Sequence, residues 1–295
     1  MPPVPLRTLN VEVPFPGCSV TLRHPILGHL LLTVNIPPGC NTGLSELIQV
    51  DDDELSDLTK GGIARIEEEV GNLGDEDAVL DLNYILKEKT SEKKYDNGVR
   101  DEGRQGMTLE DFLSLPQCQE AKLKEVEVAA LRFYSSKSFS HITAPIRDLA
   151  RRDRGEMVPL PATTIHVVSG LKKLRRVGAK KSDAVIEKIF FRGMKNLKMT
   201  DEFARVGGTE LAPMSTTSEL AIAVRYGMSR NSLIFRIVTR NNLERGSDIS
   251  HISVFPSESE VLFAPLTFLQ PTGRSQILKL GGITVTVVEV TPTAS

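Results

Sequence analysis

The chain has 295 residues, of which 40% are hydrophobic and 25% are charged, a composition typical of a globular protein with one large or two small domains. Its 36 basic and 38 acidic residues give a net charge of −2, so we expect no overall attraction to nucleic acid or to an anionic membrane. The first residues lack the apolar core of a signal peptide, the apolar runs are too short for a membrane helix, and the three cysteines are widely spaced. We therefore expect a cytoplasmic protein.

The amino-terminal part of the chain predicts short strands. Residues 8–13 alternate polar and apolar side chains, and residues 32–36 repeat this alternation, which is typical of a strand with one buried face. Such strands need a partner surface for their apolar side chains. We expect a small β-rich accessory unit that packs on the rest of the protein.

The next part of the chain predicts a transition between two units. An acidic helix is expected over residues 51–70, where apolar side chains recur at helical spacing. Residues 87–104 are highly charged and contain almost no large apolar side chains, as a linker or an exposed loop does. We predict a boundary near residue 100, with the accessory unit at residues 1–100 and a second domain at residues 101–295.

The second domain predicts helices first and then mostly strands. Its helices are expected at residues 119–134, 163–176 and 218–226, and its strands at residues 186–191, 232–239 and 282–290. Ser218 is expected to cap the third helix and Gly227 to end it. This order of elements favours an α+β fold over a doubly wound parallel sheet.

The sequence lacks the common signatures of nucleotide and metal sites. It has no G-x-G-x-x-G after a strand, no G-x-x-x-x-G-K-[ST], no H-E-x-x-H, no paired C-x-x-C and no G-x-S-x-G. Its five histidines are scattered along the chain. We therefore expect no metal ion, no Rossmann domain and no P-loop.

Three segments carry candidate functional side chains, and the first contains an arginine. Arg192 follows the apolar run at residues 186–191 and precedes Gly193. A guanidinium on a rigid strand can bind a phosphate through two hydrogen bonds, and a glycine lets a ligand approach the backbone. Taken alone, such an arginine is more often the partner of an ion pair.

The second segment is a run of hydroxyl side chains, Ser215, Thr216, Thr217 and Ser218, at the start of an expected helix. Capping a helix uses one hydroxyl, so the others are free to orient a neighbouring carboxylate. Taken alone, such a run more often combines a helix cap with a polar strand end.

The third segment is Glu258-Ser259-Glu260, which precedes the apolar residues 261–263. In an extended chain, residues two apart point to the same side, roughly 6.5 to 7 Å from each other. Two such acidic residues usually form a solvated turn. On one side of a strand, however, one carboxylate can stabilise an oxocarbenium-like sugar while the other orients or deprotonates the attacking group.

In this order, the three segments resemble the R-S-E class of ADP-ribosyltransferases, which includes the cholera-toxin-like enzymes and the vertebrate arginine-specific ecto-transferases. Upstream, residues 128–135 and 141–147 resemble the family's helix and the stretch that follows it, so the resemblance covers about residues 105–290. The sequence departs from the family pattern at Thr217, which stands where the family has serine, and at Thr143, which replaces an asparagine.

The resemblance implies a split, mostly antiparallel sheet with flanking helices and with NAD⁺ in the central cleft, and it makes the second domain catalytic. By their positions in the family pattern, Arg192 would bind the phosphates of NAD⁺ and the Gly193 backbone would bind the nicotinamide carboxamide. Ser215, Thr216 and Thr217 would complete the NAD⁺-binding set.

The resemblance also implies the roles of the two glutamates. Ser215 would hold Glu260, which would accept a hydrogen bond from the nicotinamide ribose and stabilise positive charge as the glycosidic bond breaks. Glu258 would position the acceptor, and Phe255 would help to recognise it. The E-x-E pattern implies transfer of ADP-ribose to arginine on a protein, or to a small guanidino compound. Nicotinamide leaves as a neutral molecule, so no metal is needed.

Three other functions stay open. The chain can be an NAD⁺ glycohydrolase, in which water replaces the acceptor, or a transferase that acts on another acceptor. It can also be a non-catalytic NAD-binding or interaction module that retains the fold without the reaction. Cleavage of NAD⁺ without Glu258 would favour the glycohydrolase, and failure to bind NAD⁺ would favour the non-catalytic module.

Overall fold

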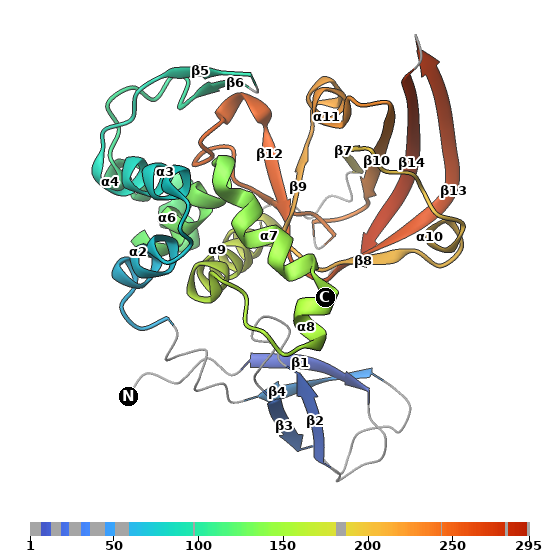
Figure 1. The fold of residues 1–295 in the computed structure, drawn as a ribbon, viewed down its shortest axis with the longest axis horizontal. Helices are drawn as coiled ribbons and strands as arrows, with labels where there is room; N and C mark the ends of the chain where they lie inside the picture. The colour runs from blue at the N-terminus through green and yellow to red at the C-terminus, as the bar shows by residue number, and fades with distance from the viewer. Residues whose placement is uncertain are drawn as a thin grey trace.

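The computed structural model describes residues 59–96, 98–180, 187–242, 244–280 and 283–293, and the backbone of four strands before residue 51 (Figure 1). These strands are β1 (Arg7–Glu12), β2 (Ser19–Arg23), β3 (Leu31–Asn35) and β4 (Ser45–Val50). β1 pairs antiparallel with β4, and β2 with β3. β1 and β3 correspond to the strands predicted in this part of the sequence. Residues 51–58 of the predicted acidic helix lie outside the described residues, and the rest of it contains α2 (Ile63–Gly71).

The helical part of the fold is built around one buried helix, α6 (Glu125–Tyr134). Val128, Ala129 and Leu131 of this helix have no exposed surface, and its charged residues Glu127 and Arg132 are buried as well, because neighbouring elements cover the helix on its different sides. α2, α3 (Glu76–Lys87), α4 (Leu109–Leu113) and α9 (Pro161–Lys180) pack around it (Figure 1). This part also contains α5 (Pro116–Ala121), the 3₁₀ turn η1 (Lys137–Phe139), α7 (Ser140–Arg147) and α8 (Leu149–Asp153). None of the described helices is long and apolar enough to cross a lipid bilayer.

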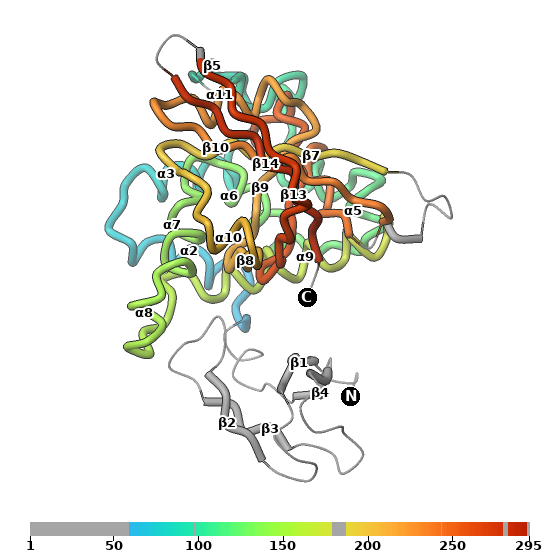
Figure 2. Tube along the Cα trace, turned by 90° about the vertical axis from the view of Figure 1, so that its right-hand side faces the viewer, coloured from blue at the N-terminus to red at the C-terminus, as the bar shows by residue number. Residues whose placement is uncertain are grey.

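The second half of the chain forms an 8-stranded sheet in the order β11-β12-β9-β7-β10-β14-β13-β8. Its strands are β7 (Lys188–Lys195), β8 (Gly208–Glu210), β9 (Met214–Thr217), β10 (Asn231–Thr239), β11 (Ser247–Asp248), β12 (Glu260–Phe263), β13 (Thr267–Leu280) and β14 (Ile283–Thr293). β10 and β14 run parallel, and the other neighbours pair antiparallel. The long strands β13 and β14 lie side by side along one face of the molecule (Figure 2).

The sheet is split near its middle. β7 pairs with β10 from Lys188 to Lys195, whereas β7 meets β9 only where Phe191 lies opposite Thr217. One part of the sheet therefore contains β11, β12 and β9, and the other begins at β7. The predicted α+β class with a split, mostly antiparallel sheet and flanking helices is confirmed.

The helices on both sides of the predicted domain boundary share one hydrophobic core. Ile66 of α2 and Leu82 of α3 belong to the same buried cluster as Leu131 of α6 and Leu171 of α9. The boundary near residue 100 stays a prediction, and α2 and α3 pack with the helices that follow it.

The stretch predicted as a linker or exposed loop contains ordered structure. β5 (Lys93–Tyr95) and β6 (Gly98–Arg100) form an antiparallel hairpin, and Asp101 directly after it is fully buried against Arg132 of α6. Composition does not reveal this arrangement, because residues 98–104 are held by paired charges and backbone hydrogen bonds and not by large apolar side chains. Much of the stretch is nevertheless exposed, including residues 87–89, 92–94 and 96, while Thr90 and Asp101 are buried, so its assignment as a linker or exposed loop stays a prediction.

Two predicted helices have different limits in the structure. The helix predicted at residues 119–134 is interrupted, because Lys122 takes the left-handed conformation with φ 52° and ends α5. The helix predicted at residues 163–176 is α9, which starts at Pro161, a favourable first residue for a helix, and continues through Gly178. Between β7 and β8, α10 (Asp201–Val206) follows its capping residue Thr200.

Candidate active site

A cavity of about 350 Å³ lies where the sheet is split. Its walls come from β7 and β9 on the two sides of the split, from α6, η1 and α7, from α11 (Leu220–Gly227) and from the β11–β12 loop, residues 249–259. The sequence-predicted residues that line it are Arg192, Gly193, Ser215, Thr216, Thr217, Phe255, Glu258 and Glu260. The fold thus brings the three predicted segments together around one cavity.

Arg192 lies within strand β7 and not at its end, where the sequence predicts it. Its Nη1 donates a hydrogen bond to the Ser215 carbonyl oxygen at 2.8 Å, which ties β7 to β9 where the ladder between them stops. Its Nη2 lies 4.0 Å from the Glu210 carboxylate. Burial lowers the pKa of Arg192, and the Glu210 charge acts against this shift, so the guanidinium remains a cation at neutral pH.

Gly193 is required by the packing of α11 across β7. A Cβ atom at Gly193 would lie 1.8 Å from the Ala223 carbonyl oxygen and 2.7 Å from the Gly227 nitrogen. Gly227 contributes to the same close approach, since a Cβ there would lie 3.3 Å from the Gly193 Cα. The sequence suggested that this glycine lets a ligand approach, and the structure adds a reason that involves no ligand.

The three hydroxyl residues of β9 all bind the segment that carries the glutamates. Ser215 Oγ donates to Glu260 Oε1 at 2.7 Å. Thr216 Oγ1 donates to the Val261 carbonyl at 2.7 Å, and Thr217 Oγ1 donates to the Glu258 carbonyl at 2.7 Å. The Ser215 side chain thus holds a carboxylate, while the two threonine side chains hold the backbone on both sides of it.

The expected cap of α11 differs in the structure. Glu219 occupies the N-cap position without a side-chain hydrogen bond, so Ser218 is not the cap. Instead, Thr217 Oγ1 accepts a hydrogen bond from the Glu219 backbone N–H at 3.0 Å. One threonine hydroxyl thus joins β9, the start of α11 and the Glu258 backbone.

Glu260 is a buried carboxylate at the start of β12, with 6% of its surface exposed. Each of its oxygens accepts a hydroxyl hydrogen bond, Oε1 from Ser215 at 2.7 Å and Oε2 from Ser253 at 3.1 Å. Burial raises the pKa of Glu260 to about 7, and the Glu258 charge adds to the rise while the two serine hydrogen bonds oppose it. This carboxyl group titrates close to neutral pH.

Glu258 reaches the cavity by a different geometry from the one predicted. It belongs to the 3₁₀ turn η2 (Pro256–Glu258), and Ser259 follows in the left-handed conformation with φ 49°, so the E-x-E segment is not an extended strand. The Tyr226 hydroxyl donates a hydrogen bond to Glu258 Oε1, and Arg225 Nη2 lies 3.8 Å from the same oxygen. Both glutamates line the cavity although the chain between them turns.

Phe255 lies beneath the β5–β6 hairpin. Only 3% of its surface is exposed, and its ring meets the Tyr95 ring edge to face, with 5.9 Å between ring centres. The sequence predicts that Phe255 helps to recognise an acceptor. In the structure, Tyr95 covers one side of Phe255, and the cavity borders it as well.

Other lining residues were not singled out as site residues. Tyr134 of α6 donates its hydroxyl hydrogen bond to the Pro213 carbonyl at 2.8 Å, directly before β9. Arg147 of α7 binds Glu210 through two hydrogen bonds of 2.9 and 3.2 Å, and Tyr226 comes from the last turn of α11. Tyr134 and Arg147 lie in segments that the family resemblance covers, whereas nothing in the local sequence marks Tyr226.

Within the described ranges, the side chains of histidine, cysteine, aspartate and glutamate form no cluster suited to a metal ion. The charged groups that line the cavity are Lys137, Arg147, Arg192, Glu258 and Glu260. A cavity with basic and acidic groups on different walls can bind a ligand that carries both phosphate and a cationic or hydroxylated part.

No protein-family model matches the chain, and no curated protein matches its sequence. Solved structures with a similar fold include Plx2a, an ADP-ribosyltransferase toxin from Paenibacillus larvae, with 16% identity, coverage of 59% of this chain and 89% of that chain, and a TM-score of 0.44. The ADP-ribosyltransferase HopU1 of Pseudomonas syringae pv. Tomato has 16% identity, coverage of 74% and 98%, and a TM-score of 0.45. The eucaryotic mono-ADP-ribosyltransferase ART2.2 has 14% identity, coverage of 82% and 87%, and a TM-score of 0.47. At these values, the similarities carry no information about the reaction.

Proposed function

We propose that the protein transfers ADP-ribose from NAD⁺ to an arginine side chain of a protein acceptor and releases nicotinamide. The observation that supports this most directly is the hydrogen bond from Ser215 Oγ to Glu260 Oε1, at 2.7 Å, in a cavity that Arg192 and Glu258 also line. A buried carboxylate held in one orientation beside a cation and a second carboxylate suits chemistry on a sugar that becomes positively charged.

Arg192 is the proposed binding group for the diphosphate of NAD⁺. A guanidinium has several N–H donors, and the bond to the Ser215 carbonyl fixes its plane while leaving others for phosphate oxygens. β7 supports it because Gly193 locks this strand against α11. The proposal thus requires little rearrangement of the arginine when NAD⁺ binds.

Glu260 is the proposed group that stabilises the transition state. When the bond between the ribose C1′ and the nicotinamide nitrogen breaks, its electron pair leaves with nicotinamide and the ribose acquires positive charge. An ionised carboxylate near the ribose stabilises that charge, and two hydroxyl donors keep this carboxylate from rotating. Because its pKa is about 7, Glu260 is ionised in a large part of the molecules at neutral pH.

Glu258 is the proposed binding group for the acceptor guanidinium. Arginine is protonated at neutral pH, so its nitrogen becomes nucleophilic only when a base takes a proton as the new bond to C1′ forms. The Glu258 side chain borders the same cavity as Glu260, and 12% of its surface is exposed. A ligand that enters the cavity can therefore contact its carboxylate.

Hydrolysis of NAD⁺ is the second candidate function, and one observation favours it. The Glu258 carboxylate already accepts a hydrogen bond from Tyr226 and lies near Arg225. An acceptor guanidinium must compete with Tyr226 and Arg225 for the Glu258 carboxylate, whereas a water molecule can attack the ribose without binding there.

Two further parts of the proposal concern the amino-terminal strands and the cellular location of the protein. We propose that the strands before residue 51 are the β-rich part of the accessory unit predicted at residues 1–100, and that this unit acts beside the catalytic fold. We also propose a cytoplasmic location, because three widely spaced cysteines do not form a disulfide framework of the kind that secreted proteins use.

The test compares the wild type with Glu258→Gln and Glu260→Gln, with Glu202→Gln on the exposed face of α10 as the control. Each protein is incubated with labelled NAD⁺ and agmatine, and the label on agmatine and the free ADP-ribose are measured separately. We expect the wild type and the control to label agmatine, Glu258→Gln to cleave NAD⁺ without labelling, and Glu260→Gln to do neither. Cleavage by the wild type without labelling would favour the hydrolase, and a folded wild type that leaves NAD⁺ intact would refute both functions.

A further inference from the structure

The β11–β12 loop is held by charged residues that lie far away in the sequence. Three successive carbonyl groups of this loop, those of residues 252, 253 and 254, each accept a hydrogen bond from the segment around residues 101–132. The donors are Arg132 Nη1 at 2.9 Å, Arg104 Nη1 at 2.7 Å and the Asp101 backbone N–H at 2.8 Å, respectively. Arg104 also donates to the Ser250 carbonyl.

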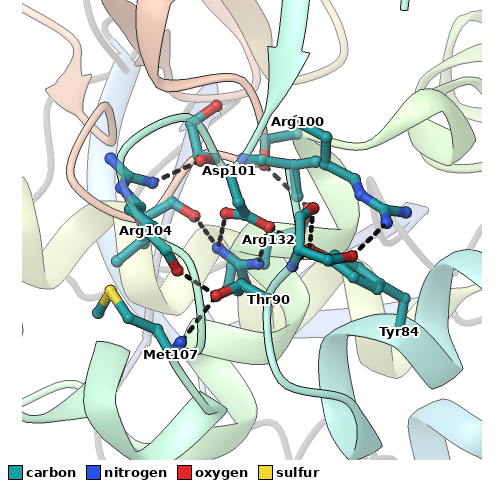
Figure 3. A network of polar contacts seen from close by, with 12 residues as sticks. Tyr84, Thr90, Arg100, Asp101, Arg104, Met107 and Arg132 are labelled. Atoms are coloured by element: carbon teal, nitrogen blue, oxygen red, sulfur yellow. Dashed lines mark hydrogen bonds and ion pairs between the residues drawn. The ribbon is translucent and has the colours of Figure 1, made fainter. Parts of the chain in front are cut away.

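These donors belong to one network, shown in Figure 3, in which Asp101 and Arg132 are buried and Arg104 is partly exposed. Arg132 Nη1 and Nη2 bind the two carboxylate oxygens of Asp101 at 3.1 and 3.0 Å, and the Tyr84 hydroxyl donates to Asp101 Oδ2 at 2.8 Å. Arg132 and Asp101 are 1% and 0% exposed. Thr90 binds the chain on the far side of Arg104: its Oγ1 donates to the Arg104 carbonyl and accepts a hydrogen bond from the Met107 N–H at 2.8 Å.

A buried ion pair of this kind is a poor way to gain stability alone, because desolvation of both charges offsets most of their attraction. Apolar side chains of similar size would fill the same space. Unlike apolar side chains, these groups form directional hydrogen bonds, which hold the loop carbonyl groups at fixed positions. We therefore expect the network to serve mainly to fix the position of the β11–β12 loop, and less to stabilise the fold.

The anchored loop reaches Glu260 through Ser253, which has no exposed surface. Ser253 Oγ donates to Glu260 Oε2 at 3.1 Å and accepts a hydrogen bond from the Phe255 N–H at 3.2 Å. One residue further, the Val254 N–H donates to Ser135 Oγ at 2.9 Å. The loop backbone is thus bound on both sides of the hydroxyl that meets the glutamate.

We propose that Asp101, Arg104 and Arg132 are positioning residues for Glu260, and that they act through the loop carbonyls and the Ser253 hydroxyl. This inference rests on the proposed function, since it concerns the carboxylate to which that function gives the central role. Ser215 holds Oε1 from one part of the sheet, and Ser253 holds Oε2 from the anchored loop. The plane of the carboxylate is then set by two independent elements.

The test uses Ser253→Ala and Arg104→Gln, with Glu69→Gln as the matched control. Arg104 is partly exposed, so its replacement leaves the buried Asp101–Arg132 pair in place. Glu69 is a buried carboxylate that binds the start of α9, where it accepts from the Ala162 and Thr163 N–H groups at 2.8 and 3.0 Å, and it does not line the cavity. Its replacement disturbs the helical core without touching the loop.

The first measurement is NAD⁺ cleavage against pH. The charged and titratable groups around Glu260 are Glu258 from η2, Tyr134 from α6 and Arg192 from β7, and Lys137 and Arg147 line the same cavity. Ser253→Ala removes a donor to the ionised carboxylate and leaves these groups unchanged. We expect the acidic limb of the kcat profile to move up by about one pH unit, the equivalent of one hydrogen bond to a charge, with KM for NAD⁺ within about twofold.

For Arg104→Gln, we expect kcat at the pH optimum to fall by about tenfold, because the loop and its serine lose a fixed position. Glu69→Gln should lower the melting temperature and retain kcat. An unchanged pH profile of Ser253→Ala would overturn the proposal. So would equal losses of kcat in Arg104→Gln and Glu69→Gln at equal losses of stability.

A second readout does not depend on activity. Hydrogen exchange at residues 249–259 should become faster in Arg104→Gln than in the wild type, while exchange in β10 stays the same. If the wild type fails to cleave NAD⁺, the proposed function fails, and this measurement still decides whether Arg104 anchors the loop. Unchanged exchange in the loop would overturn the anchoring.

Discussion

The hydroxyl of Tyr226 donates a hydrogen bond to the carboxylate of Glu258, so the chain itself occupies one oxygen of the glutamate assigned to the acceptor. Tyr226 is the penultimate residue of α11, and Arg225 beside it approaches the same oxygen. An acceptor guanidinium must replace or join these groups. The strength of this contact should therefore influence how tightly an acceptor binds.

Replacing Tyr226 by phenylalanine should release Glu258 for the acceptor. A hydrogen bond of this kind contributes about 0.5 to 1.5 kcal/mol net, so we expect KM for agmatine to fall by roughly two- to tenfold. The measurement is the initial rate of agmatine labelling at saturating NAD⁺. A higher KM in Tyr226→Phe would mean that the tyrosine helps to hold the acceptor.

Gly193→Ala should destabilise the fold. The new Cβ would lie 1.8 Å from the Ala223 carbonyl oxygen, so α11 must move away from β7. We expect a loss of about 3 kcal/mol in the free energy of unfolding, the upper part of the usual range for overpacking, because the clash is with backbone atoms. Gly178→Ala is the control, because nothing lies within 4 Å of its Cβ position, and an alanine in an exposed helix should gain about 0.5 to 1 kcal/mol. Urea unfolding of both variants checks this, and equal effects would refute the packing argument.

The raised pKa of Glu260 makes stability depend on pH. Its ordinary value of 4.5 applies to the unfolded chain, and the value in the fold is about 7. Between these two values the folded state keeps the proton that the unfolded state has lost. The stabilisation is therefore fully present below about pH 4.5 and is lost as pH rises to about 7, by roughly 3 kcal/mol in total.

Glu260→Gln removes this dependence, because a glutamine stays neutral. We expect the variant to be more stable than the wild type at pH 8 and to lose that advantage at pH 4.5. Urea unfolding of both proteins at the two pH values checks the sign. The same difference at both values would show that Glu260 does not titrate in this range.

Asp101→Ala should be more costly than an ordinary buried substitution. It leaves the Arg132 guanidinium, which is 1% exposed, without its carboxylate partner. Removing one member of a buried ion pair costs about 3 to 5 kcal/mol. Thermal unfolding measures the loss, and Asp111→Ala, which removes an exposed side chain that pairs with Thr108, provides the comparison. If Asp101→Ala and Asp111→Ala both lowered the melting temperature only slightly, the Asp101–Arg132 ion pair would not be tightly held.

The three segments that line the cavity could be singled out from the sequence, because each combines a local pattern with a distinct side chain. Arg192 follows an apolar run, and Glu258 and Glu260 precede another, so strand positions could be predicted for their neighbourhoods. The detailed geometry of these segments could not be predicted from the sequence. The turn at Ser259 needs a positive φ that no local pattern of this stretch requires, and the requirement for Gly193 arises from a helix that crosses its strand.

The network around Asp101 was beyond prediction for a different reason. Its members are charged residues in a stretch without large apolar side chains, and composition alone assigns such a stretch to solvent. Burial becomes favourable only when Arg132, about 30 residues away, provides the opposite charge. A pairing of that kind depends on tertiary contacts, and no window of local sequence contains it.

The meeting of β7 and β9 at the single pair Phe191 and Thr217 has a consequence for how such a cavity can be lost. Fully paired strands lie about 4.8 Å apart, which leaves no room for a ligand between them. The cavity thus exists because the ladder stops. A change that lets these strands pair further would close the cavity while leaving every candidate side chain in the sequence, so the added strand pairing would stabilise the fold while the proposed site disappears.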